Sequence, residues 1–93
     1  MLVVNQGLSG DFHIFRGSEA SEFLASLHVV AARKAVVILP PRRIERGSFF
    51  LTKAGTLLLV LNSENLDDEL VKRAFDKVAD KFARQLQEAY GRK

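Results

Sequence analysis

Residues 48–61 read SFFLTKAGTLLLVL, and this stretch decides the fold. Two strongly apolar runs, 48–52 and 57–61, flank a short polar connection. Within that connection, Gly55 lies where a tight turn requires a positive φ, a conformation that glycine adopts without steric cost. The stretch therefore predicts an antiparallel β-hairpin.

Shorter apolar runs on the N-terminal side predict further strands. They cover residues 2–4, 12–16 and 35–39, and the last run is bounded by Pro40-Pro41, which cannot continue the interior of a strand. The segment from Pro40 to Gly47 is therefore predicted to be a connection between strands.

Two segments show the spacing of amphipathic helices. The first runs from Glu19 to about Val29, after Ser18 as a good N-cap. The second runs from Leu66 to Tyr90, with one apolar stripe. Ser63 or Asn65 is its predicted N-cap. We therefore expect a single α+β domain over residues 1–93, with a mostly antiparallel sheet and both helices packed on one face.

The composition indicates a small protein that lacks cysteine. The chain has 93 residues, no Cys and a formal net charge of +3. A chain this short buries only about 60–65 % of its unfolded surface, so a partner would supplement a thin core. The absence of Cys excludes disulfides and thiolate chemistry and fits a reducing cytoplasm. No apolar run approaches a signal peptide or the ~20 residues of a membrane span, so a soluble cytoplasmic protein is expected.

Positive charge is concentrated between residues 33 and 53, which hold six basic residues and one acidic residue. Clustered arginine and lysine bind the phosphates of nucleic acids. The candidate nucleic-acid ligands are Arg42, Arg43, Arg46 and Lys53. The alternative is a solvated connection whose charges keep two hydrophobic strands soluble. No aromatic residue is interleaved with the three arginines, so a base-stacking platform is not indicated.

Two mismatches of apolar surface predict a protein partner. A final helix of about 25 residues would extend past strands of about five residues. Its C-terminal half should then contact another molecule, and the predicted partner-binding residues are Phe75, Val78, Phe82 and Leu86. The strands are also apolar on both faces, which leaves one face without cover. Homo- or hetero-oligomerisation through the sheet or its edge would cover it; alternatively, the N-terminal segment folds back over it.

No motif for catalysis, a cofactor or a metal occurs in the sequence. The phosphate-binding loop, the dinucleotide fingerprint and the zinc-protease and serine-hydrolase patterns are absent. His13 and His28 have no partner at metal-ligand spacing, so structural or surface roles are predicted. We therefore expect a non-enzymatic protein without a cofactor, and an active site built across an oligomer interface is the remaining alternative.

From Phe12 to Ala89, the order of predicted elements resembles the Pcc family, the small non-catalytic subunits of the KEOPS complex. The resemblance rests on three segments: Pro40-Pro41-Arg42-Arg43, the hairpin over 49–61 and the step Asn65-Leu66-Asp67 that opens the long helix. Residues 72–76 match the pattern of the family's final helix only in part. The chain therefore resembles a divergent paralogue of the dimerisation subunit more than its standard form.

The resemblance implies a subunit of machinery that installs threonylcarbamoyl on a tRNA adenosine. Such a subunit packs its helices on a KEOPS-like catalytic subunit and pairs through its sheet with itself or a sister small subunit. It also implies tRNA as a ligand of the basic segment. The alternative is a small RNA-binding α+β module that uses this segment as a basic loop.

Overall fold

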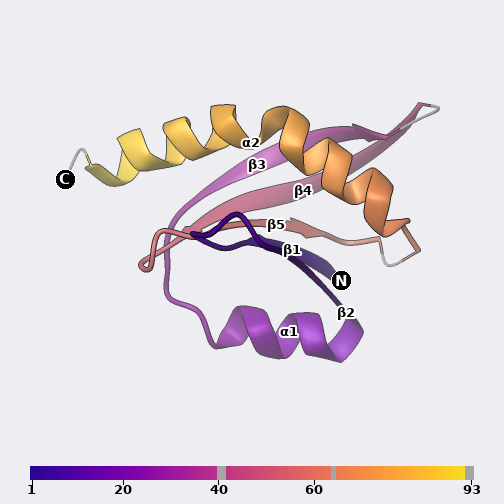
Figure 1. The fold of residues 1–93 in the computed structure, drawn as a ribbon, viewed down its shortest axis with the longest axis horizontal. Helices are drawn as coiled ribbons and strands as arrows, with labels where there is room; N and C mark the ends of the chain where they lie inside the picture. Colours follow the sequence, from indigo (N-terminus) through magenta and orange to yellow (C-terminus); the bar gives the residue numbers. More distant parts are fainter. Residues whose placement is uncertain (40–41, 64, 92–93) are drawn as a thin grey trace.

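The computed structural model describes residues 1–39, 42–63 and 65–91. Its elements in chain order are β1 (Leu2–Gln6), β2 (Phe12–Arg16), α1 (Gly17–Ala25), β3 (Val29–Leu39), β4 (Arg43–Thr52), β5 (Leu57–Leu61) and α2 (Asp68–Gly91). The strands form one antiparallel sheet in the order β2-β1-β5-β4-β3. Figure 1 shows this sheet lying between the two helices. The predicted α+β fold with an antiparallel sheet is confirmed.

The hairpin predicted from residues 48–61 is β4–β5. Gly55 has a φ of 91°, and its N–H donates a hydrogen bond of 2.9 Å to the carbonyl of Thr52. The hydroxyl oxygens of Thr52 and Thr56 lie 2.6 Å apart across the same turn. Glycine at the left-handed position and a threonine pair at the strand ends therefore close the hairpin as expected.

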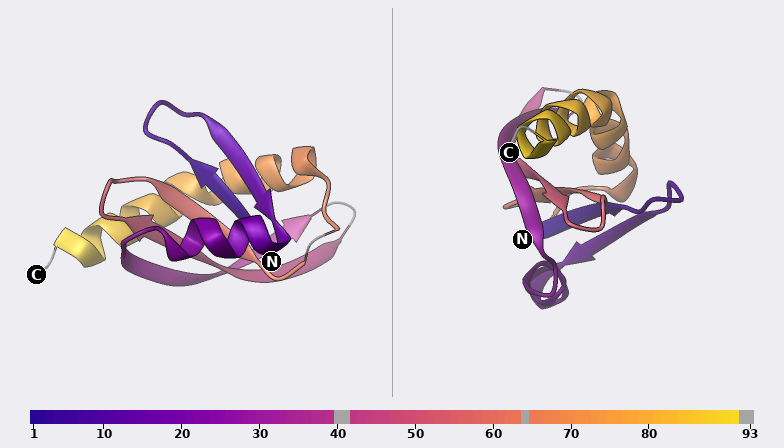
Figure 2. Two further views of the ribbon diagram at one scale, coloured as in Figure 1. Left: turned by 90° about the horizontal axis from the view of Figure 1, so that it is seen from below. Right: turned by 90° about the vertical axis from the view of Figure 1, so that its left-hand side faces the viewer.

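The two helices cover opposite faces of the sheet, so the prediction that both pack on one face is wrong (Figure 2). Neighbouring residues of β1 show the division. Val4 packs with Phe75 of α2, whereas Val3 packs with Ala20 of α1. Because successive side chains of a strand point to opposite faces, a strand that is apolar at consecutive positions needs cover on both. We call the two sides of the sheet the α2 face and the α1 face.

β3 and β4 are about twice as long as predicted. β3 begins at Val29, where the first helix was expected to end, and β4 begins at Arg43, inside the expected connection. The two strands stay in register from Ala31 opposite Leu51 to Leu39 opposite Arg43. Val29 and Val30 are β-branched and favour a strand over a last helical turn, and α1 accordingly ends at Ala25. Pro40 and Pro41, predicted to stop the strand, lie outside the described residues.

The length of β3 limits how far the final helix projects beyond the sheet: the C-terminal end of α2 extends past the strands in Figure 1, and residues 87–91 are exposed. An eleven-residue strand spans about 36 Å, which is also the length of the 24-residue helix α2. α2 therefore packs on the sheet along most of its length, and Leu86 near its C-terminal end is buried.

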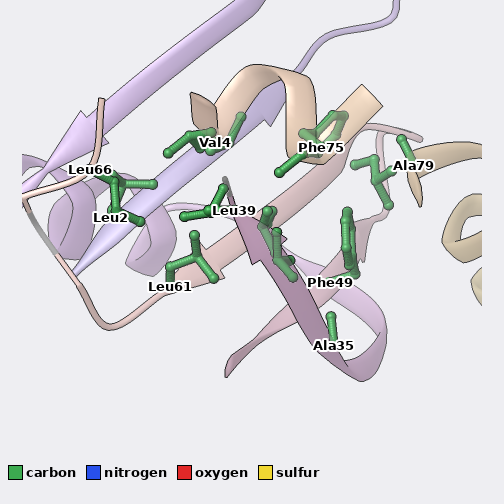
Figure 3. Close-up of a cluster of buried hydrophobic side chains, with 14 of the residues drawn as sticks. Leu2, Val4, Ala35, Leu39, Phe49, Leu61, Leu66, Phe75 and Ala79 are labelled. Carbon is green, nitrogen blue, oxygen red and sulfur yellow. The ribbon is translucent and has the colours of Figure 1, made fainter. Parts of the chain in front are cut away.

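The main core lies between α2 and the sheet (Figure 3). Phe49 of β4 stacks on Phe82, with ring centroids 4.5 Å apart, and lies 5.5 Å from Phe75. Phe75 also meets Phe12 of β2 edge to face at 5.2 Å. A smaller cluster beneath α1 contains Val3, Ala20 and Leu58. Aromatic pairs of this geometry add to the hydrophobic stabilisation of the core.

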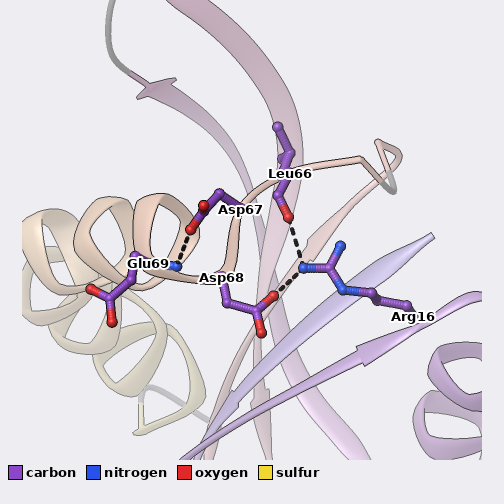
Figure 4. A network of polar contacts seen from close by, with 5 residues as sticks. All are labelled: Arg16, Leu66, Asp67, Asp68 and Glu69. Atoms are coloured by element: carbon purple, nitrogen blue, oxygen red, sulfur yellow. Dashed lines mark hydrogen bonds and ion pairs between the residues drawn. The ribbon is translucent and has the colours of Figure 1, made fainter.

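A polar network fixes the start of α2 against β2 (Figure 4). The guanidinium of Arg16 donates a hydrogen bond of 2.7 Å to the carbonyl of Leu66 and forms an ion pair with Asp68. The N–H of Glu69 donates to the Asp67 carboxylate at 2.8 Å. Asp67 therefore satisfies a free N–H of the first turn, and the prediction of Ser63 or Asn65 as the cap is wrong.

We expect Asp68→Asn to lower the free energy of unfolding by no more than about 1 kcal/mol, because exposed ion pairs contribute little. The Asp68 side chain is 66 % exposed and Arg16 keeps its bond to Leu66. Urea denaturation in low and high salt measures the loss, which should shrink as salt screens the pair. Asp76→Asn on the exposed surface of α2 is the control, and a loss above about 2 kcal/mol would contradict the assignment.

Candidate functional site

The predicted partner-binding residues of α2 face the core of the molecule. Phe75 is fully buried and Leu86 is 2 % exposed. Phe82 is partly buried against Phe49, and Val78 is also partly buried. Phe75 and Leu86 cannot reach a partner in this conformation, so their assignment to a partner surface is wrong. The physical reason is that β3 and β4 are long enough to cover the apolar stripe of the helix.

The predicted nucleic-acid ligands are divided between the two ends of β4: the three arginines lie at its start and Lys53 follows its last residue. Arg43 forms an ion pair with Glu45 and donates a hydrogen bond of 3.1 Å to the Ser63 hydroxyl. Arg42 precedes β4, and Lys53 follows it at the far end of a ten-residue strand that spans about 33 Å. The structure therefore does not bring these residues into one site.

Arg46 lies near a lysine that was not among the predicted ligands. Arg46 is opposite Val36 in the register, and Lys34 is opposite Ser48. Lys34, Arg46 and Ser48 line an open hollow of about 350 Å³ on the sheet. The two cations come from neighbouring strands and are diagonal neighbours on one face. Of the predicted basic cluster, only Arg46 therefore belongs to a basic surface on the sheet.

The sheet has one long free edge. β3 is the last strand in the order, and its outer side pairs with no other strand of the described chain. It has eleven residues, whereas β2 at the opposite edge has five. A strand at an edge presents a row of unpaired N–H and C=O groups, which is a template for pairing with another chain.

An apolar patch adjoins this edge on the α1 face. Val36, Ile38 and Ile44 are 58 %, 68 % and 63 % exposed, and Ile38 lies opposite Ile44 in the register. α1 packs on β1 and β2 and leaves this part of the face uncovered, as Figure 2 shows. The prediction of an uncovered apolar face is therefore confirmed for β3 and β4. The alternative that the N-terminal segment covers this face is correct for β1, β2 and β5, which α1 covers, but not for the patch.

A small apolar groove adjoins the same edge on the α2 face. Its volume is about 130 Å³, and it lies between β3 and α2. The lining residues are Val36, Val37, Ile38, Ala74, Lys77 and Val78. Val78 is thus the one predicted partner-binding residue that lines this groove. We call the free edge of β3, the patch and the groove together the β3 edge site.

The sequence reasoning missed Ile44 and Lys77. Ile44 was placed in a connection, because charged residues surround it and no long apolar run includes it. Its alternation with Arg43 and Glu45 is the only strand signal there, and that signal is weak. Lys77 was not singled out, because a lysine on the polar side of an amphipathic helix is ordinarily a solvated surface residue.

No other chemistry is apparent in the part of the chain that the structure describes. Among residues 1–39, 42–63 and 65–91 there is no group of three side chains that could hold a metal ion. No helix within the same ranges combines the length and the apolar character needed to cross a bilayer. His13 and His28 are both exposed.

Comparisons of the chain with protein families, with curated proteins and with solved structures give no match. The resemblance to the Pcc family stays a prediction from the sequence.

Proposed function

We propose that this chain is a non-catalytic assembly subunit that binds a protein partner through the β3 edge site. The observation that supports the proposal is an eleven-residue edge strand with solvent-exposed Val36 and Ile38. Natural proteins normally protect such an edge with charges, proline or a covering element. Here Arg33 and Lys34 are the only charges in the strand, and residues 35–39 are all apolar.

The resemblance to the small KEOPS subunits supports the same kind of role. On that basis the partner is a catalytic subunit or a sister small subunit of a tRNA-modifying complex in the cytoplasm. The contact expected from the apolar stripe of α2 is now assigned to the sheet edge, with Val78 as the helix residue beside it. RNA binding by Arg42, Arg43, Arg46 and Lys53 stays an alternative, but the distance of Lys53 from the arginines and the ion pair between Arg43 and Glu45 give it less support.

The test compares two lysine substitutions at exposed apolar residues. Ile38→Lys places a charge in the β3 edge site, whereas Leu8→Lys changes a residue that is 79 % exposed in the turn between β1 and β2. Tagged versions would be expressed in the source cells, and associated proteins quantified by mass spectrometry. Sedimentation velocity of the purified variants would report self-association, and circular dichroism would confirm that both fold.

We expect Ile38→Lys to reduce the association with one protein by about tenfold or more, because it places a charge in an apolar contact. Leu8→Lys should leave it unchanged. A chain that stays monomeric, and whose associated proteins are the same for both variants, would refute the proposed function.

A further inference from the structure

We infer that the β3 edge site binds an extended acidic segment of a different protein, which adds as a new strand beside β3. This inference rests on the proposed function and specifies the chemistry of the partner. It predicts apolar residues at alternate positions of the segment and acidic residues around them.

The two sides of the edge account for the alternating apolar positions. A strand added beside β3 would direct successive side chains to opposite faces of the sheet. On the α1 face, these side chains would meet Val36 and Ile38, which are exposed. On the α2 face, they would meet the groove that Ala74 and Val78 line. Apolar residues fit both sides, and the backbone of the segment would use the free groups of β3.

Positive charge along α2 accounts for the acidic residues. Lys77 lines the groove beside β3. Residues three or four positions apart lie along one side of a helix, which places Arg73, Lys81 and Arg84 in one row with Lys77. All four side chains are exposed, and within the described ranges none of them forms an ion pair. By the same spacing, Glu69 precedes Arg73 and Glu88 follows Arg84, so an acidic residue lies at each end of the row.

The opposite side of α2 has a different character. Asp80 lines a hollow with Gln6 and Gly10 near the turn between β1 and β2. Lys72 lies over the ring of Phe12 in β2, with its Nζ 5.1 Å from the centroid. Lys77 and Lys81 therefore lie on the β3 side of the helix, whereas Arg73 and Arg84 lie on its outward surface, next to Asp80. Arg33 and Lys34 are also exposed, on β3 itself, and extend the positive surface along the edge.

The same charges disfavour the other occupants. If two copies paired through β3 about a two-fold axis, each basic row would approach that of the other copy, and like charges at an interface cost binding energy. A nucleic acid would satisfy the charges but would leave Val36, Ile38 and the strand backbone without complementary groups. An acidic β-strand would complement the basic charges, the exposed apolar residues and the free backbone groups of β3.

Selection from random displayed peptides of about twelve residues tests this inference on the folded chain. We expect the selected peptides to combine alternating apolar residues with net negative charge. Two synthetic versions of one such peptide would be N-methylated at alternate residues. One version would carry the methyl groups at the odd positions and the other at the even positions. Methylation of the N–H groups that donate to β3 should abolish binding, whereas methylation of the N–H groups that point away from β3 should be tolerated.

Charge reversal in α2 provides the matched variants. Lys77→Glu should weaken binding of the acidic peptide about tenfold at low salt, and less at high salt. Lys72→Glu makes the same change on the far side of α2 and should have little effect. Ile38→Glu removes the apolar contact and adds a charge that repels the acidic segment, so it should abolish binding at both salt concentrations.

The inference would be overturned by the absence of any selected peptide, by selected peptides without acidic residues, by equal effects of Lys77→Glu and Lys72→Glu, or by binding that is insensitive to N-methylation. A dimer lost on Ile38→Lys would assign the edge to a second copy, and tight oligouridine binding lost on Lys77→Glu would assign it to nucleic acid. The dimer result would leave the proposed function standing and refute only the acidic segment.

Discussion

Replacing Phe75 with alanine is expected to lower the free energy of unfolding by about 3–5 kcal/mol, the usual loss for a buried phenylalanine. The side chain is fully buried and its ring contacts both Phe12 and Phe49. Its removal would leave a cavity between α2 and the sheet. Since small domains have a total stability of about 5–15 kcal/mol, this substitution should remove at least about a fifth of the stability of the domain.

Urea denaturation followed by circular dichroism measures this loss. Phe75→Leu, which keeps most of the apolar volume, should be clearly less destabilising. Phe12→Ala is a second comparison: it should lower the free energy of unfolding by less than Phe75→Ala, because Phe12 is only partly buried against the same cluster. If Phe75→Ala retained wild-type stability, the side chain would not belong to the core and its assignment as a partner residue would regain support.

Replacing Gly47 with alanine is expected to cost about 3 kcal/mol or more, at or above the usual cost of overpacking. A Cβ atom at this position would lie 2.2 Å from the carbonyl oxygen of Val60 and 2.7 Å from a methyl carbon of Leu61. The first of these contacts is with backbone, so β4 and β5 would have to separate. The cost therefore comes from the close approach of two strands rather than from an unusual φ.

Gly7→Ala is the matched control for this substitution. The nearest atom to a Cβ there is the carbonyl oxygen of Asp11 at 4.0 Å, which is an ordinary contact. Its effect should be within about 0.5 kcal/mol. Thermal and urea denaturation of both variants measure the difference. Equal stability of the two variants would show that the approach of β4 and β5 is looser than described.

The sequence predicts those parts of the fold whose signals are local. The hairpin around Gly55 and the long final helix follow from apolar runs, turn chemistry and helical spacing, and the structure contains both. The extension of β3 to Val29 and of β4 to Arg43 does not follow, because residues there are stabilised as strands mainly by their cross-strand partners. Local propensity contains no information about such partners.

The position of α1 on the sheet is the feature of the site that could not be predicted from the sequence. Consecutive apolar residues in β1 indicate that both faces need cover, but they do not indicate which helix covers which face. Once α1 is placed beneath β1 and β2, the exposure of Ile38 and Ile44 follows directly. Two of the residues predicted on the helix as a partner surface, Phe75 and Leu86, are therefore buried, whereas the expected uncovered sheet face is present at Val36, Ile38 and Ile44.

The strand order has a consequence for the order in which the domain can assemble. β1 is joined to β2 and β4 to β5 by short turns, but β1 pairs with β5 across a long stretch of chain, as Leu2 opposite Leu61 shows. Closing a loop of that length costs about 2 kcal/mol more in chain entropy than closing the β4–β5 turn. The two ends of the sheet can form as separate local units, and α1 connects them before they meet. Docking of β1 on β5 is therefore the step that turns two partial sheets into one cooperative domain.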